Sequence, residues 1–275
     1  MSKTLKCIVI QTGILIALLG GTGCKEKPVT VTAKAETAGL YPHGPLWGAL
    51  WQQRAAEYKA LCFQAYYTAT LSLNELLKQP SKMPRAIVTD IDETVLDNSP
   101  YYVHQALNGE MYSDASWMEW TARVACDTVP GALSFLKYAA SKGVKVFYIT
   151  NRLEAERKIT LENLQKWGFP DADDAHLTLK QTTSSKDERR NLVAAGHNII
   201  MLLGDNLGDF ATAFDKQTYE NRDSLVVNGA TQFGTRFIVL PNPMYGDWEE
   251  VLFKYGKDLS VAEKNEQLKK WVKNY

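Results

Sequence analysis

A short apolar run ends in a dense group of acids in the stretch VTDIDETVLDN, residues 88–98. The run from Arg85 to Ile91 has the length and composition of a buried strand, so the acids gather at a strand's carboxyl end. Carboxylates at one strand terminus repel each other, and a folded protein tolerates them best when a cation lies among them. Oxygen ligands favour a hard divalent ion, so this stretch predicts a metal site beside a buried strand.

Apolar runs and helical patterns alternate along the chain after Pro84. This alternation is typical of a parallel sheet covered by helices on both faces, and such sheets bind ligands at the carboxyl ends of their strands. The sequence therefore predicts a three-layer, Rossmann-like α/β fold. The expected strands are Arg85 to Ile91, Val144 to Ile149, His176 to Leu179, Asn198 to Leu203 and Thr235 to Leu240, and the expected helices are Gly131 to Lys142, Leu153 to Trp167 and Ser185 to Ala195.

Two segments differ from this alternating core. Large apolar residues at helical spacing from Trp47 to Leu77 predict one or two amphipathic helices in an N-terminal segment, residues 41–84. An aromatic stretch with the turn signal Asn108-Gly109 predicts a small, mainly helical cap inserted at about residues 99–128. The alternating core is then expected over residues 85–257, followed by a C-terminal helix over residues 258–275.

The next three strand ends carry further polar groups. The hydroxyl and amides of Thr150-Asn151-Arg152 follow the second expected strand and can hold the oxygens of an anion. Lys186 opens a helix after the third strand, where free amide donors and the helix dipole favour an anion. Asp205 and Asp209 follow the fourth strand and add two acids. These groups predict one site that holds both a metal ion and an anion.

Simpler interpretations of the acidic stretch fit the sequence less well. A calcium loop between two helices would need glycine and glutamate at the places that hold Val95 and Tyr101. A solvated acidic turn would leave the groups at the other strand ends unexplained. The sequence also lacks the motifs of cysteine and histidine phosphatases, serine hydrolases, P-loop proteins and HExxH zinc enzymes.

These residues resemble the four motifs of the haloacid dehalogenase (HAD) superfamily, namely Asp90-x-Asp92-x-Thr94, Thr150, Lys186 and Asp205-x-x-x-Asp209. More narrowly, DIDETVLDNSPY (residues 90–101) and GDNLGDF (residues 204–210) are similar to the class C acid phosphatases. That family consists of secreted bacterial lipoproteins, several of which act as 5′-nucleotidases. The resemblance runs from Glu57 to Glu249 and implies a HAD-like catalytic domain that hydrolyses phosphate monoesters.

The resemblance also implies a role for each matching residue. Asp90 is the expected nucleophile, which forms an aspartyl-phosphate, and Asp92 is the expected general acid and base. One Mg²⁺ per chain is expected between the side chains of Asp90 and Asp205 and the main-chain carbonyl of Asp92. The residues expected to hold the phosphoryl oxygens are Thr150, Asn151 and Lys186, with Asp209 as a support for the metal and for Lys186.

The leaving group of the substrate is expected to lie against the cap. In the family, aromatic residues at the places of Tyr112, Trp117 and Tyr245 clasp a planar base, and such stacking contributes about 1–3 kcal/mol per base. Asp97 and Asn98 are expected to face the sugar. The alternatives are an ordinary aromatic core in the cap, a sugar phosphate as the substrate, and a non-catalytic surface lipoprotein that binds a small ligand.

The first residues of the chain predict export. Lys3 and Lys6 precede a short apolar run, and GGTGC (residues 20–24) resembles the lipobox of bacterial lipoproteins, in which Cys24 would be acylated. Plain cleavage and release, without a lipid, is the alternative. Residues 1–23 are then a signal peptide and residues 24–40 a flexible tether. The expected location is the outer membrane or the cell envelope, with the lipid as the membrane anchor.

Charge and cysteine content limit the partners. Lysine plus arginine and aspartate plus glutamate number 31 each, so no nucleic-acid polymer is expected as a partner. Cys7 would leave with the signal peptide, and Cys62 and Cys126 are expected to be ordinary buried residues, with a disulfide between them as the alternative. The expected partner is a small phosphate monoester, and assembly into an oligomer stays open.

Overall fold

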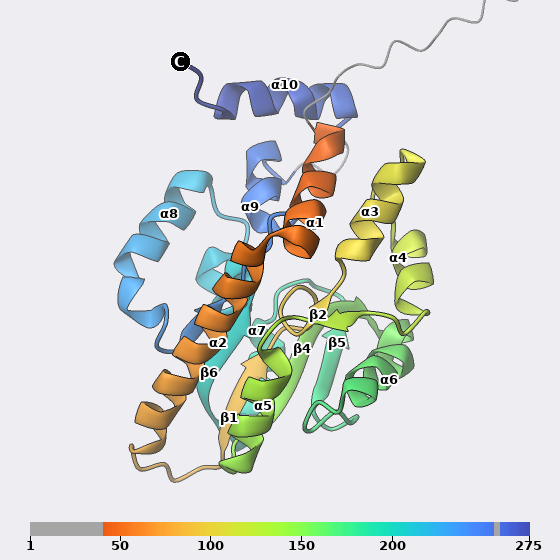
Figure 1. Ribbon diagram of the computed structural model, residues 1–275. Helices are drawn as coiled ribbons and strands as arrows, with labels where there is room; N and C mark the ends of the chain where they lie inside the picture. Colours follow the sequence, from red (N-terminus) through yellow and green to blue (C-terminus); the bar gives the residue numbers. More distant parts are fainter. Residues whose placement is uncertain (1–40, 256–258) are drawn as a thin grey trace, which may run out of the picture. The chain divides into compact units, whose positions relative to one another are not determined.

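The computed structural model describes residues 41–255 and 259–275. The predicted signal peptide, the tether and Cys24 lie outside these residues. The described residues form the predicted α/β fold, in which helices cover both faces of a parallel sheet (Figure 1). The HAD-like fold class, with a small helical cap and an N-terminal helical segment, is confirmed.

The main sheet has five parallel strands in the order β5-β4-β1-β6-β7. A short antiparallel pair, β2 and β3, joins the two ends of the cap segment. The strands are β1 Arg85–Thr89, β2 Leu96–Asp97, β3 Asp127–Thr128, β4 Lys145–Leu153, β5 Leu177–Lys180, β6 Asn198–Gly204 and β7 Phe237–Val239.

Alternate residues of the central strand β1 enter two different cores. Ile87 packs with α2 (Ala56–Leu77), α5 (Ala132–Ser141) and α6 (Arg157–Trp167) on one face of the sheet. Ala86 and Val88 pack with α7 (Asp187–Gly196) on the other face. A strand that is buried on both faces has no polar side, which explains why β1 reads as a continuous apolar run.

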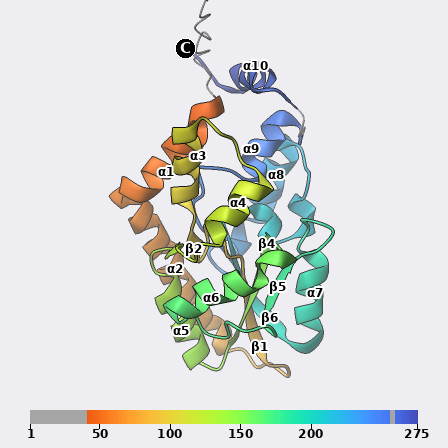
Figure 2. The ribbon, with the colours of Figure 1, turned by 90° about the vertical axis from the view of Figure 1, so that its right-hand side faces the viewer.

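The N-terminal segment and the cap lie against each other. Helices α1 and α3 are side by side in both ribbon views (Figures 1 and 2). The remaining α-helices are α1 Gly44–Arg54, α3 Ser99–Asn108, α4 Asp114–Thr121, α8 Tyr219–Asn228, α9 Asp247–Glu250 and α10 Val261–Trp271. The 3₁₀ helices are η1 Tyr41–His43, η2 Glu154–Glu156, η3 Leu207–Asp209, η4 Thr212–Phe214, η5 Ala230–Gln232 and η6 Val251–Phe253.

Two predicted boundaries near the site are wrong. The expected strand Val144 to Ile149 continues to Leu153, because β4 shifts register against β5 between Ile149 and Leu153 and resumes pairing beyond the irregularity. Thr150, Asn151 and Arg152 therefore lie within β4 instead of following it. The helix expected from Leu153 starts with η2, and its α-helical part α6 begins only at Arg157.

One further prediction concerns the cysteines. Cys62 and Cys126 are both buried free thiols, as expected for ordinary core residues. Within residues 41–255 and 259–275, the helices all lack the combination of length and apolar character that a membrane span requires.

Candidate active site

The parallel register of β1 and β6 brings two acidic loops together. Thr89 of β1 pairs with Leu203 of β6, and the main-chain amide of Asp90 donates to Leu203 O at 2.9 Å. Asp90 and Asp205 are the residues that follow these two strands by one position. Parallel strands end at the same edge of a sheet, so the two acids meet there although the sequence separates them widely.

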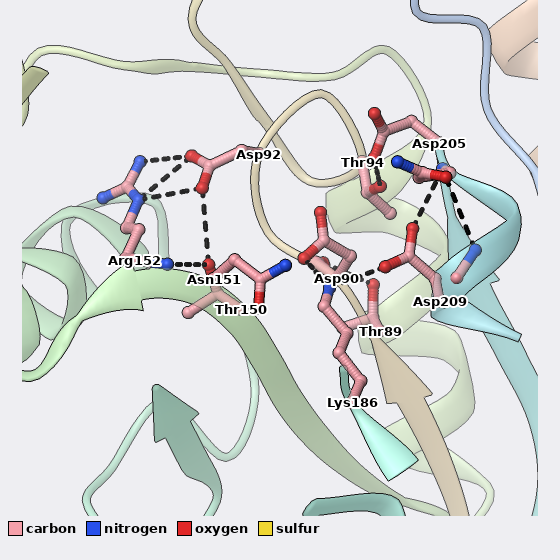
Figure 3. Close-up of polar contacts among 12 residues, drawn as sticks. Thr89, Asp90, Asp92, Thr94, Thr150, Asn151, Arg152, Lys186, Asp205 and Asp209 are labelled. Carbon is pink, nitrogen blue, oxygen red and sulfur yellow. Dashed lines mark hydrogen bonds and ion pairs between the residues drawn. The ribbon is translucent and has the colours of Figure 1, made fainter. Parts of the chain in front are cut away.

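Three carboxylates meet at this edge and face a single lysine (Figure 3). One oxygen from each of Asp90, Asp205 and Asp209 lies within 4.8 Å of the others. Lys186, the N-cap residue of α7, contacts Asp90 directly and places its Nζ 2.7 Å from Asp209 Oδ1. The structure therefore brings together the first, third and fourth of the predicted motifs.

Two acids of this group, Asp205 and Asp209, are held by neighbouring polar groups. Asp205 accepts hydrogen bonds from Thr94 Oγ1 at 3.2 Å and from Asn242 Nδ2 at 2.8 Å. Asp209 accepts one from the main-chain amide of Asn206 at 2.9 Å. Because these partners hold the side chains from outside, the carboxylate oxygens keep their close spacing.

The electrostatics of the three acids fit a bound cation. Burial raises the pKa of Asp90 from 3.8 to about 7, with Lys186 lowering it and Asp209 raising it further. Burial, together with Asp209 and Asp90, holds the pKa of Asp205 well above its usual range. The single positive charge of Lys186 does not balance the negative charge that three carboxylates would carry. A closely spaced set of carboxylate oxygens suits a hard divalent ion, so the residues fit the predicted metal.

The metal-free protein should lose stability as the pH rises from about 4 to about 7. The pKa of Asp90 is raised on folding, so the native state keeps a proton that the unfolded chain releases in this window. Mg²⁺ needs the deprotonated acids, so its stabilising effect should be largest at neutral pH and decline on acidification. Thermal unfolding with EDTA and with Mg²⁺, at about pH 5.5 and about pH 7.5, tests both trends. A metal-free protein that is more stable at the higher pH would contradict this electrostatic account.

Asp92 belongs to a second cluster beside the first. Its carboxylate forms an ion pair of 2.7 Å with the buried Arg152 and accepts a hydrogen bond from Thr150 Oγ1 at 3.3 Å (Figure 3). It also accepts a hydrogen bond from Asn98 Nδ2 at 2.9 Å. The side chain of Asp92 thus lies apart from the three grouped acids. The metal contact expected of Asp92 is through its main-chain carbonyl, and that contact stays a prediction.

The polar residues predicted to touch the substrate have other partners in the structure. Asn98 is fully buried, and its side chain holds Asp92 and accepts from Trp120 Nε1 at 2.9 Å. Asp97 accepts from Gln52 Nε2 at 2.7 Å. Asn151 is exposed, with its side-chain oxygen bonded to Arg189 at 2.8 Å. Their predicted contacts with sugar or phosphate stay predictions.

The three predicted aromatic residues share one group of rings. Tyr245 stacks on Tyr102 of the cap with the ring centres 5.1 Å apart, and its hydroxyl contacts the buried Glu93. Tyr102 also packs against Tyr101, which meets the buried Trp117 edge-on at 5.0 Å. Tyr112 lies 6.0 Å from Trp117 and is exposed. Tyr245, which lies between β7 and α9, therefore joins the cap aromatics.

Gly204 leaves the space that Asp209 occupies. A side-chain carbon on Gly204 would lie 2.2 Å from Asp209 Oδ2 and 2.4 Å from its Cβ. Gly204→Ala should therefore displace Asp209 from Lys186 and lower the free energy of unfolding by about 1–3 kcal/mol, the usual cost of overpacking. Gly196→Ala is the matched control, because Gly196 has nothing within 4 Å of that position. Urea unfolding measures both variants, and equal stability of the two would show that Asp209 can move freely.

Several residues of the site were not predicted from the sequence. They are Arg152 beside Asp92, Glu93 beside Tyr245, Asn242 beside Asp205, and the arginines Arg189 and Arg190 of α7. Charged residues within or next to the quoted motifs were the available signal for Arg152 and Glu93. Asn242 follows the last strand and offered no such signal.

Comparisons with known proteins identify the family of the chain. A family model described as "HAD superfamily, subfamily IIIB (Acid phosphatase)" matches residues 22–248. A class C acid phosphatase structure from Bacillus anthracis is 40% identical and covers 85% of this chain and 98% of that one, with a TM-score of 0.82. The structure of that enzyme with tungstate bound is 39% identical and covers 86% and 99%, with a TM-score of 0.83.

A plant protein named Acid phosphatase 1, from Solanum lycopersicum, is also similar. The two are 30% identical over 166 residues, which cover 58% of this chain and 57% of the tomato protein. The chain thus spans little more than half the length of this relative. The family model covers most of the chain, and the chain belongs to the acid phosphatases of HAD subfamily IIIB.

Proposed function

We propose that this protein is a magnesium-dependent acid phosphatase that hydrolyses phosphate monoesters, including nucleoside 5′-monophosphates, through an aspartyl-phosphate intermediate. The observation that carries the proposal is the buried Asp90 in contact with Lys186, within 4.8 Å of oxygens of Asp205 and Asp209. An anionic nucleophile that must approach an anionic phosphate needs positive charge on both sides. Lys186 supplies it on one side, and the acids fit a metal ion on the other.

The chemistry proceeds in two steps on Asp90. A carboxylate oxygen of Asp90 bonds to phosphorus while the ester oxygen leaves and takes a proton from Asp92. Water then attacks the phosphoryl group and gives a proton to Asp92, which releases phosphate and free Asp90. Magnesium, held by Asp90 and Asp205 with the Asp92 carbonyl, would lower the repulsion between Asp90 and the phosphate.

The second cluster supports the role of Asp92. Arg152, Thr150 and Asn98 hold the Asp92 carboxylate in place through direct contacts, which fixes the position from which it would exchange a proton. Thr150 is also the hydroxyl proposed to hold a phosphoryl oxygen. The related Bacillus enzyme binds tungstate, an oxyanion like phosphate, which supports an oxyanion site in this chain.

The aromatic group supports a planar leaving group. Tyr245, Trp117 and Tyr112 belong to one set of neighbouring rings at the cap, and Tyr112 is exposed. A base that stacks on such rings gains about 1–3 kcal/mol. We therefore propose that mononucleotides are better substrates than phosphate esters of the same charge that lack a ring.

The location of the protein is part of the proposal. We propose that the chain is exported and anchored in the outer membrane or cell envelope through a lipid on Cys24. Incorporation of a labelled fatty acid tests this in cells, with Cys24→Ser as the variant that should lose the label.

Hydrolysis of an aryl phosphate tests the activity itself. We expect turnover of 4-nitrophenyl phosphate that EDTA stops and added Mg²⁺ restores, and a protein inactive under both conditions would refute the proposal. A panel of AMP, nicotinamide mononucleotide and glucose phosphate then tests the substrate class. Trp117→Ala should lower turnover of the two mononucleotides and leave that of the sugar phosphate near the wild-type rate.

A further inference from the structure

Two adjacent arginines on α7 lie behind the candidate site. Arg189 and Arg190 follow Lys186 by three and four positions, and their exposed fractions are only 8% and 7%. Most of their hydrogen bonds go to main-chain carbonyls of the loops and strand ends that form the site. A buried guanidinium used in this way fixes the backbone, because its rigid, planar group sets the position of each acceptor.

Arg189 joins the end of β4 to the turn before α7. It donates to Thr150 O at 2.6 Å and to Asn151 Oδ1 at 2.8 Å. It also donates to Ser184 O at 3.1 Å and to Ser185 O at 3.0 Å, just before Lys186. One side chain therefore sets the spacing between Thr150 and Lys186, the two groups proposed to hold phosphoryl oxygens.

Arg190 reaches the loop after β6 instead. Its Nη1 donates to Gly208 O and to Asp209 O, both at 3.0 Å. These carbonyls belong to η3, which presents Asp209 to the group of three acids. Arg190 thus fixes the backbone on the acidic side of the site.

We propose that Arg189 and Arg190 are positioning residues with separate tasks, Arg189 for the oxyanion-binding side of the site and Arg190 for the metal-binding side. The inference rests on the proposed function. It goes further by dividing the site into two halves, each held by its own arginine on one helix. Neither arginine needs to touch the substrate or the metal for this role.

Binding of the two ligands measured separately tests the division. Mg²⁺ affinity is measured by calorimetry without oxyanion, and tungstate affinity is measured at saturating Mg²⁺. Arg189→Lys should weaken tungstate binding about tenfold and leave Mg²⁺ binding within about twofold, on the scale typical for residues that support ligands. Arg190→Lys should give the reverse pattern, because lysine keeps the charge but its flexible stem does not hold a donor at the fixed position of Arg190 Nη1, which bonds to both carbonyls.

Arg85→Lys is the matched control. Arg85 also donates to main-chain carbonyls, those of Leu77 and Gln79, but at the opposite edge of the same sheet. We expect both affinities of this variant to equal those of the wild type. Circular dichroism and thermal unfolding of each variant establish that it is folded before binding is measured.

Other outcomes count against the division. If each arginine variant weakens both ligands to the same extent, or neither ligand, the two halves do not exist as separate units. If the lysine variants fail to fold, the arginines are general structural supports, and the inference is equally wrong. If the wild-type protein itself binds tungstate without any effect of Mg²⁺, the proposed function fails instead.

Discussion

Asp90→Asn is expected to lower the turnover of phosphate monoesters by about 10⁴-fold or more, the scale on which removal of a covalent nucleophile acts. Asparagine keeps the shape of the side chain but offers no anionic oxygen to bond to phosphorus. The phosphorylated form of the protein should also disappear, because Asp90 is the proposed carrier of the phosphoryl group. Steady-state hydrolysis of 4-nitrophenyl phosphate and mass spectrometry of acid-quenched protein measure the two effects.

The stability of Asp90→Asn shows whether its loss of activity comes from the missing nucleophile or from unfolding. Asp90 is one of three grouped acids, so its neutralisation removes repulsion in the metal-free protein. The free energy of unfolding of Asp90→Asn in EDTA should therefore equal or exceed that of the wild type near neutral pH. Asp173→Asn, in an exposed turn before β5, is the control that should keep full activity. Near-normal turnover in Asp90→Asn would end the proposal of an aspartyl-phosphate on this residue.

The sequence predicted the sheet because the strands are buried on both faces. Continuous apolar runs such as Arg85–Thr89 and Asn198–Gly204 are visible without any structure, and the polar residues after them predicted which edge holds the site. The end of β4 could not be predicted in the same way. Its register shift depends on pairing with β5, and Thr150 to Arg152 carry no local signal that the strand continues.

The acids and the lysine of the site could be predicted because each comes after a strand, and Thr150 could be predicted because it directly follows the apolar run of β4, although the strand continues past it. The supporting residues could not, because their partners come from distant segments. Arg189 bonds to carbonyls 39 and 4 positions away in the chain, and any residue type offers a carbonyl. The direction of the Asp92 side chain likewise follows from Arg152, which lies 60 positions further on.

Lys186→Met is expected to affect both stability and activity. Lys186 is buried and is the ion-pair partner of Asp90 and Asp209. Its removal leaves the acids without their neighbouring cation, and breaking a buried pair from one side costs about 3–5 kcal/mol of unfolding free energy. Loss of one donor to the phosphoryl oxygens should lower turnover by about 10²- to 10³-fold as well.

Magnesium separates the electrostatic cause from a packing defect. A divalent cation among Asp90, Asp205 and Asp209 would offset the charge that Lys186 no longer balances, so Mg²⁺ should raise the melting temperature of Lys186→Met more than that of the wild type. Activity should stay low, because the ion does not replace the donor on the side of the phosphate that Lys186 occupies. Lys158→Met, on the exposed face of α6, is the control and should match the wild type in EDTA and in Mg²⁺. If Lys186→Met is as stable as the wild type in EDTA, the grouped acids do not need a cation, and the metal site loses its physical basis.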